Sequence, residues 1–184
     1  MKEIPVMCYT NYPEVELFVN GKSYCKKAKD SSGLYTRYRI EWNVAYEPGE
    51  IKAIAYDSLG KAVEECVIKT AGKPYAIRFS ADREEIAADG RDLSYITAEV
   101  VDKDGNVCPH ASSMLYFSVE GSGELKALCN GDPTDYVPFT APYMRVYNGK
   151  LVATIISERG KTGTITLKAV SENLKETFIN IKTK

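Results

Sequence analysis

Apolar and polar side chains alternate with a period of two in short runs along most of this chain. Residues 14–19 place Val15, Leu17 and Val19 on one face of an extended segment, and residues 37–44 repeat the pattern. Successive side chains of a strand point to opposite faces, so this alternation is typical of half-buried β-strands. The expected strands cover residues 14–19, 37–44, 50–56, 61–69, 75–80, 93–101, 114–119, 124–129, 150–157, 162–170 and 174–182. Because no window of ten or more residues has a convincing helical period, the sequence predicts an all-β fold.

Turn signals separate these runs and divide the chain into two parts. Asn20-Gly21 is a strong signal for a two-residue hairpin turn. Thr70-Ala71-Gly72-Lys73-Pro74 interrupts the alternation, and a new series of strands begins after it. We therefore predict two immunoglobulin-like antiparallel β-sandwich domains in tandem. The first covers residues 1–71, and the second covers residues 72–184 and includes a long loop at 130–148.

The core of the first domain is predicted to centre on Trp42. It is the only tryptophan, and it alternates in phase with Tyr38, Ile40 and Val44. A large aromatic side chain on the apolar face of a strand contributes much of the area that a small domain buries. We expect Trp42 to be fully buried.

Charge and hydropathy exclude two classes of partner. The chain has 184 residues, a hydrophobic fraction of 44% and a formal net charge of −1. Binding to nucleic acid needs clustered Lys and Arg, and the densest basic stretch, Lys22, Lys26, Lys27 and Lys29, is interpreted as a solvated loop. Membrane insertion is also not expected, because no run reaches about 18 apolar residues. The start, Met1 to Val6, has no apolar signal-peptide core, and we expect a piece of a longer chain.

The five cysteines give no metal or redox motif. They are Cys8, Cys25, Cys66, Cys108 and Cys129, and no two have C-x-x-C spacing. Cys8, Cys66 and Cys129 lie in apolar runs, so we predict that they are small buried hydrophobic residues.

The residues needed for catalysis are also missing. His110 is the only histidine and lies in an expected loop, so neither a hydrolase triad nor a histidine-based metal site can be assembled. Gly121-Ser122-Gly123 precedes a strand and not a helix, which argues against a phosphate-binding loop. The acids mostly fall on polar strand faces or in turns such as Asp102-Lys103-Asp104-Gly105, where solvation explains them. We expect no catalytic residue, metal or cofactor in this chain.

The 130–148 loop holds the candidate binding residues. In Asn130-Gly131-Asp132-Pro133, Asp132 together with Asp135 could ligate Ca²⁺ or bind a sugar. The favoured alternative is that these side chains satisfy backbone groups in a tight turn. Tyr136, Tyr143 and Tyr147 could stack on sugar rings, although burial or domain packing is the commoner role of tyrosine.

Several motifs together resemble the domains that follow the catalytic barrel in bacterial family 2 glycoside hydrolases of the β-galactosidase type. The segment from Thr10 to Ser23, TNYPEVELFVNGKS, and the segment from Trp42 to Tyr56 resemble the first of these domains. The second domain is matched by Gly72-Lys73-Pro74, Ala88-Asp89-Gly90-x-Asp92-Leu93-Ser94, Val100-Val101-Asp102-Lys103-Asp104-Gly105, Asn130-Gly131-Asp132-Pro133 and Asn148-Gly149. The chain departs from the family at Met144-Arg145-Val146-Tyr147, where a more basic or Phe-containing run is expected.

The resemblance implies a non-catalytic C-terminal region whose parent is a periplasmic or secreted glycoside hydrolase. The family's two catalytic glutamates lie in a (β/α)₈ barrel, which has no counterpart here, so no catalytic residue is carried over. The implied partners are that barrel, carbohydrate, and a homo-oligomer formed through the parent. Three functions stay open: a brace for the barrel or a dimer interface, a carbohydrate-binding module, and an adhesin-like surface stalk. A platform of exposed aromatic residues would favour the second, and neighbouring sandwich domains in the full gene would favour the third.

Overall fold

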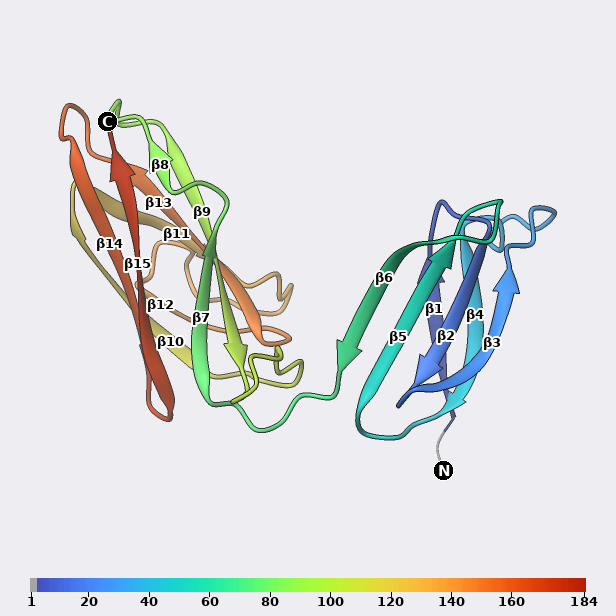
Figure 1. Cartoon of the computed structure of the whole chain (residues 1–184). Helices are drawn as coiled ribbons and strands as arrows, with labels where there is room; N and C mark the ends of the chain where they lie inside the picture. The colour runs from blue at the N-terminus through green and yellow to red at the C-terminus, as the bar shows by residue number, and fades with distance from the viewer. Residues whose placement is uncertain (1–2) are drawn as a thin grey trace. The chain divides into compact units, whose positions relative to one another are not determined.

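The structure, a computed structural model, describes residues 3–184 and confirms the all-β class. These residues form fifteen strands and no helix (Figure 1). Four expected strands, 14–19, 50–56, 93–101 and 150–157, have the predicted bounds. The chain divides into two compact units between Thr70 and Ala71, one residue before the boundary expected from the sequence. Within the described range, no helix is long and apolar enough to cross a membrane.

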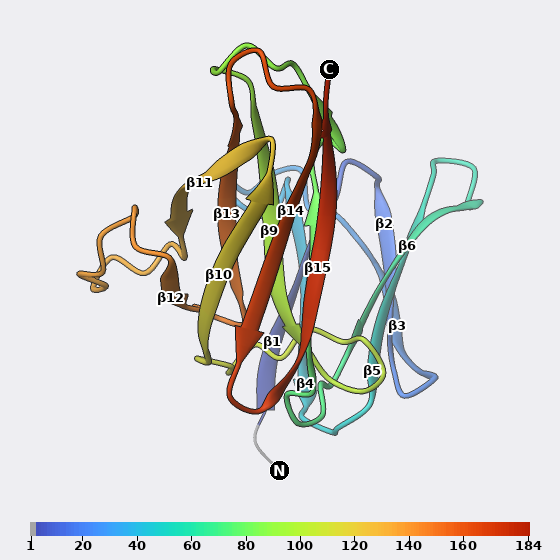
Figure 2. The ribbon, with the colours of Figure 1, turned by 90° about the vertical axis from the view of Figure 1, so that its left-hand side faces the viewer.

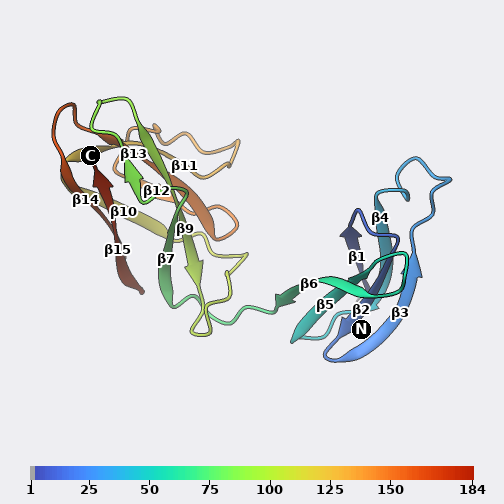
Figure 3. The same cartoon turned by 45° about the horizontal axis from the view of Figure 1, so that its top comes forward.

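Unit 1 is a sandwich of two unequal antiparallel sheets. Its strands are β1 (Glu3–Tyr9), β2 (Glu14–Val19), β3 (Lys22–Ala28), β4 (Arg39–Ala45), β5 (Glu50–Tyr56) and β6 (Ala62–Lys69). β1 pairs with β4 in one layer, and the other layer has the order β3-β2-β5-β6 (Figure 3). Alternation places the apolar residues of β2 and β4 between the layers. The buried core consists of Val15, Leu17, Val19, Ile40, Trp42, Val44 and Ala55.

The predicted role of Trp42 is confirmed, but one of its expected neighbours lies elsewhere. The indole is 3% exposed, and its Nε1 donates a hydrogen bond to the Cys25 carbonyl oxygen at 3.2 Å. Tyr38 precedes β4 and is 58% exposed, so its place in the core was predicted wrongly. The chain leaves the extended conformation before residue 39, and the parity of the strand no longer fixes the direction of the Tyr38 side chain.

Lys22, Lys26 and Lys27 of the basic stretch lie on strand β3, and not in the solvated loop that the lysines indicated. Asn20 and Gly21 both have positive φ, 48° and 79°, as a two-residue hairpin turn requires, and the turn returns the chain along β2. On this strand Lys26 forms an ion pair with Glu14 at 2.8 Å, and its ammonium lies 3.7 Å from the centroid of the Tyr56 ring. These contacts between strands let a lysine-rich segment form the edge of a sheet.

Unit 2 is a larger sandwich whose two layers are joined along one edge. Its strands are β7 (Ala76–Ala81), β8 (Glu85–Ile86), β9 (Leu93–Val101), β10 (Met114–Gly121), β11 (Gly123–Cys129), β12 (Tyr143–Arg145), β13 (Lys150–Ser157), β14 (Gly163–Ser171) and β15 (Leu174–Thr183). One layer has the order β11-β13-β9-β7, and the other places β15, β14, β10 and β12 side by side (Figure 2).

Most strand pairs of unit 2 are antiparallel, as predicted, and two pairs are parallel. β15 pairs in parallel with β7 and with β8, because the first strands of the unit run in the same direction as its last strand. The pairing of β7 with β15 is what connects the two layers.

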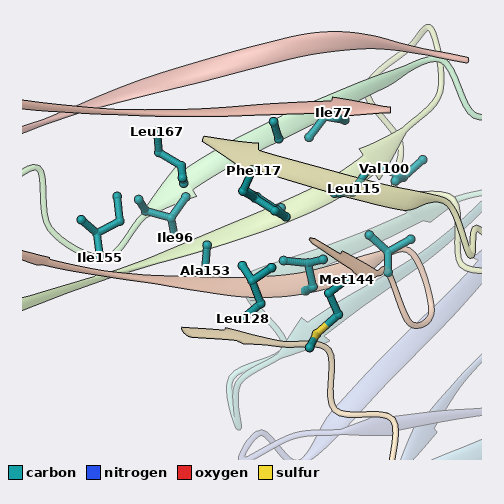
Figure 4. Close-up of a cluster of buried hydrophobic side chains, with 14 of the residues drawn as sticks. Ile77, Ile96, Val100, Leu115, Phe117, Leu128, Met144, Ala153, Ile155 and Leu167 are labelled. Carbon is teal, nitrogen blue, oxygen red and sulfur yellow. The ribbon is translucent and has the colours of Figure 1, made fainter. Parts of the chain in front are cut away.

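The core of unit 2 fills the space between its layers. Side chains from both sheets, among them Ile96, Leu115, Phe117, Ile155 and Leu167, converge there (Figure 4). The chain crosses between layers at Gly121-Ser122-Gly123, where a Cβ on Gly121 would lie 1.9 Å from the Thr164 carbonyl oxygen. Gly121 also has a φ of 102°, so this crossing requires glycine.

The turn after β9 is held by a buried carboxylate. Asp102 was predicted to lie in a solvated turn, but it is 5% exposed. Its oxygens accept hydrogen bonds from the backbone N–H groups of Gly72 at 2.7 Å, Asp104 at 2.9 Å and Asn106 at 2.8 Å, and from the Asn106 side chain at 3.1 Å. These donors replace the water that the carboxylate loses, and we call this arrangement the Asp102 clasp. The clasp ties the first residues of unit 2 to the β9 turn.

The prediction of buried cysteines is wrong for two of the three residues. Cys66 and Cys129 are exposed, and Cys8 is half-buried, whereas Cys108 is the buried thiol. Cys66 lies on β6, which is exposed along its whole length, and Cys129 ends β11. An apolar run indicates that a segment forms a strand, but burial also requires a second layer over that strand.

Candidate binding surfaces

A hydrolytic centre in residues 3–184 would have to use His110 or the carboxyl groups. His110 is exposed in the loop before β10. Among the described residues, no three His, Cys, Asp or Glu side chains are placed to hold a metal ion. A retaining glycosidase needs two carboxyl groups about 5–5.5 Å apart, one with a raised pKa. The described carboxyl groups with a clear pKa shift all have a lowered pKa, and they are Asp30, Glu85, Asp89, Asp92, Glu99 and Asp102.

Glu99 illustrates why these acids serve in ion pairs and hydrogen-bonded turns rather than in proton transfer. Burial by itself raises its pKa, but hydrogen bonds from Lys150 and Arg78 outweigh that effect and leave the pKa lowered. The Glu99 oxygens lie 2.8 Å from the Lys150 ammonium and 2.7 Å from the Arg78 guanidinium. A carboxylate held between two cations stays ionised and cannot donate a proton to a glycosidic oxygen.

The 130–148 loop is anchored at both ends and contains the short strand β12. The Asn130 side-chain amide donates to the Asp135 carboxylate at 2.7 Å and to the Arg145 carbonyl oxygen at 3.0 Å. Met144 and Val146 are 1% and 2% exposed and belong to the core of unit 2. The loop was expected to be irregular throughout. Its second half instead contains β12, which pairs with β10, while the alternating apolar residues 144 and 146 point into the core.

Asp132 is engaged within its own turn. Its Oδ1 accepts hydrogen bonds from the backbone N–H and the hydroxyl of Thr134, at 2.9 and 2.8 Å. The Asp132 backbone N–H in turn donates to the Asn130 side-chain oxygen at 2.9 Å. This is the arrangement in which Asn and Asp side chains satisfy a tight turn. Contact of Asp132 with a sugar stays a prediction.

The three loop tyrosines are exposed. Tyr136 lies in the middle of the loop and is 96% exposed. Tyr143 begins β12, and Tyr147 lies two residues beyond the end of that strand. Stacking of these tyrosines on a sugar ring stays a prediction.

Sequence reasoning missed Tyr116, which is the aromatic partner of Tyr143. The two residues are opposite each other on β10 and β12, and their ring centroids are 6.1 Å apart. Their exposed fractions are 53% and 41%. The exposed parity of Tyr116 in its strand could be read from the sequence, but its pairing with a strand 27 residues later could not, because the alternation does not give strand order.

A shallow groove crosses the outer face of the same sheet. It has a volume of about 430 Å³, and its lining includes Ser118, Thr166, Lys168 and Phe178. Ser118, Lys168 and Phe178 are cross-strand neighbours on β10, β14 and β15. Two residues before Ser118 on β10, Tyr116 points to the same face. This face therefore combines exposed aromatic rings with hydroxyl and ammonium groups.

Two known families match the two units. Residues 77–180 match glycoside hydrolase family 2 C-terminal domain 5, and residues 1–64 match a domain of unknown function, DUF4982. Among curated proteins, the chain is similar to the β-galactosidase BoGH2A of Bacteroides ovatus, with 42% identity over 181 residues. That match covers 98% of this chain and 21% of the relative.

Solved structures of larger glycoside hydrolase chains contain the same fold. The match to a β-glycosidase from Bacteroides vulgatus has a TM-score of 0.90 and 33% identity, and it covers 98% of this chain and 22% of that one. A glycosyl hydrolase family 2 member from Bacteroides cellulosilyticus matches with a TM-score of 0.88 and 34% identity, over 100% of this chain and 23% of that one. The chain thus spans about a fifth of the length of the proteins that it matches.

Proposed function

Because this chain belongs to the glycoside hydrolase family 2 C-terminal domains, we propose that it is the non-catalytic accessory region of a β-galactosidase-like enzyme, where it braces the catalytic barrel or a subunit interface. The match over 98% of this chain to only 21% of a β-galactosidase is the observation that carries the proposal. The lowered carboxyl pKa values support it, because they suit ion pairs and turns and not acid catalysis. The glycoside hydrolase relatives favour this function over a surface stalk.

The experiment compares the 184-residue chain with its full-length parent on a chromogenic β-galactoside. We expect turnover by the parent and none by the chain. Turnover by the chain alone, abolished by substitution of one of its own acids, would contradict the proposal. A parent that lacks this region should melt at a lower temperature than the intact parent if the region is a brace.

Carbohydrate binding is the second candidate function, and the pairing of Tyr116 with Tyr143 is the observation that favours it. Exposed aromatic rings beside hydroxyl groups can stack on the apolar face of a sugar and donate hydrogen bonds to its edge. Binding of lactose can be followed by NMR chemical shifts. Tyr116→Ala and Tyr143→Ala should then abolish the shifts, whereas Tyr136→Ala is the matched control on an exposed tyrosine. Equal effects of all three substitutions would contradict a site at this pair.

A further inference from the structure

The two layers of unit 1 differ in width, so one side of its interior has no cover. The narrow layer has two strands, β1 and β4, and it faces four strands in the other layer. β4 lies toward β3, since the Trp42 indole donates to Cys25 and the Lys27 ammonium donates to the Glu41 carbonyl oxygen at 2.8 Å. β1 is therefore the last strand of its layer on the other side, toward β6, and its outer backbone edge has no strand partner in the described chain.

The register of β6 identifies which of its side chains point toward the interior. Glu64, Cys66 and Ile68 are paired with Ala55, Ala53 and Ile51 of β5. Directly opposed residues of an antiparallel pair point to the same face, and Ala53, Ala55 and Ile51 belong to the core cluster. Glu64, Cys66 and Ile68 are nevertheless exposed, and Ile68 is 67% exposed. An inward-facing isoleucine in water indicates a missing part of the sandwich.

A cleft of about 630 Å³ marks the uncovered interior. Its floor includes Val15, Ala53 and Ala55, and Cys8 of β1 and Cys66 of β6 lie on its walls. Burial raises the pKa of the Cys8 thiol, and the nearby Cys66 and Glu64 raise it further, which agrees with β1 facing β6 across this cleft. The volume lies within the range of about 300–1,000 Å³ that is usual for sites that bury a ligand.

The two faces of β6 are not equivalent. The outer face carries Val63, Glu65 and Val67, and a charge on this face is a usual way of protecting a free edge. The inward face carries Glu64, Cys66 and Ile68 and lies over the uncovered cleft. The inward face is therefore the one that calls for a partner.

We propose that the open edge of unit 1, formed by the free side of β1 and the inward face of β6, docks an extended apolar segment of the parent chain from outside this C-terminal region. The inference rests on the proposed function. About four-fifths of each matched enzyme lies outside the region that this chain covers, so the occupant is covalently linked and present at high effective concentration. Pro5 has no backbone N–H to donate, so an extended segment pairs with β1 beyond Pro5, and its apolar side chains enter the cleft.

The thiols of the chain provide the test. Alkylation by iodoacetamide is measured by peptide mass spectrometry, with the thiols kept reduced, on the 184-residue chain and on the full-length parent. Cys66 and Cys25 are both exposed, and Cys25 lies on β3 at the other end of the same sheet, so it is the internal control. We expect the Cys66 rate to fall at least about tenfold in the parent while the Cys25 rate is unchanged, because thiol reactivity requires access. Equal Cys66 rates in the two proteins would overturn the proposal.

Two variants of the parent distinguish the two faces of β6. Ile68→Lys places a charge on the inward face and should restore Cys66 reactivity. Val67→Lys places the same charge on the outer face and should leave Cys66 protected. If both substitutions restore reactivity, or neither does, the assignment of the docking face is wrong.

The remaining outcomes separate the occupant from the proposed function. Protection of Cys66 already in the 184-residue chain would overturn the choice of occupant. Protection that rises with concentration, together with a dimer on size-exclusion chromatography, would identify a second copy of the chain as the cover. Protection at every concentration would identify a cover within this chain. Activity of the same parent sample on the β-galactoside tests the proposed function on its own. An active parent with a reactive Cys66 therefore contradicts only the docking inference.

Discussion

At the scale of single residues, Trp42 and Tyr38 show what strand parity can and cannot predict. Both residues have the parity of the apolar face in residues 37–44, but only Trp42 lies within β4 and is buried. Parity is a property of the extended backbone, so it predicts burial only as far as the strand continues. Strand β4 begins at Arg39, one residue after Tyr38. The Tyr38 N–H donates to the Tyr35 carbonyl oxygen, and the Tyr38 carbonyl oxygen accepts from the Thr10 N–H. A local sequence pattern does not reveal these hydrogen bonds.

Trp42→Ala should destabilise unit 1 by roughly 3–5 kcal/mol, because it removes a buried indole and leaves a cavity. The measurement is denaturant unfolding followed by far-ultraviolet circular dichroism. Tyr38→Ala is the matched control, an aromatic truncation at an exposed position with an expected change within about 0.5 kcal/mol. Similar losses in the two variants would show that Trp42 is not the anchor of this core.

The Asp102 clasp predicts an acid-dependent contribution to the stability of unit 2. The hydrogen bond from the Gly72 N–H, together with those from Asn106 and Asp104, lowers the pKa of Asp102 to about 2. The unfolded value is about 3.9, so the unfolded chain binds more protons between these pH values and stability rises with pH there. The contribution is fully present above about pH 4 and is lost as the pH falls through about 2.

Asp102→Asn should therefore lower the melting temperature of unit 2 at neutral pH and reduce its fall between pH 4 and pH 2. Thermal unfolding across this pH series measures both effects. Asp104→Asn is the control, because no hydrogen bond from the described residues reaches its carboxylate. A pH profile of Asp102→Asn parallel to that of the unsubstituted chain would contradict the role of the clasp.

At the scale of elements, β3 and β6 mark the limit of reasoning from local patterns. The strand pattern of β6 was predicted, but the exposure of Cys66 was not, because alternation assigns a side chain to a face and does not say whether a second layer covers that face. The lysines of β3 obscured a strand that the Asn20-Gly21 turn requires. The Tyr116–Tyr143 pair could not be predicted for a related reason, since it depends on which strands become neighbours.

The Asn130 side chain is a main anchor of the 130–148 loop. Asn130→Ala removes three hydrogen bonds, with the Asp135 carboxylate, the Arg145 carbonyl oxygen and the Asp132 N–H, and should increase amide hydrogen exchange in residues 131–142. The expected loss of stability is about 1–2 kcal/mol. Thr134→Ala is the control, since it removes only a hydroxyl contact within the exposed turn. Unchanged exchange in Asn130→Ala would show that the other anchors hold the loop, which are the buried Met144 and Val146 and the backbone hydrogen bonds to Phe139 and Pro142.

At the scale of the whole molecule, the two units differ in the size of their cores. Among the residues that the structure describes, nineteen buried side chains form the core cluster of unit 2, against seven in unit 1. A smaller unit buries a smaller fraction of its surface and has less stability to lose. We therefore expect two calorimetric transitions, with unit 1 melting first.

Substitutions in the two cores identify the transitions. Trp42→Ala should move only the lower one, and Leu167→Ala, at a fully buried position of unit 2, should move only the upper one. Separate responses are expected because distant sites with no shared contacts act independently. A single transition that both variants shift equally would contradict two independently folding units.

The Asp102 clasp also defines where related proteins could exchange these modules by recombination. Thr70 belongs to unit 1, since its N–H donates to the Gly49 carbonyl oxygen at 2.7 Å and its hydroxyl accepts from the Gly49 N–H at 3.0 Å. Ala71 packs against the core of unit 2, and Gly72 donates to Asp102. The contacts of the chain thus change from unit 1 to unit 2 at the peptide bond between Thr70 and Ala71. A chimaera joined between Thr70 and Ala71 inherits both sets of contacts intact. A crossover after Gly72 instead takes residue 71, which packs against the core of unit 2, from the other parent, and it keeps the clasp only if residue 72 is not proline, because the donor to Asp102 is a backbone N–H.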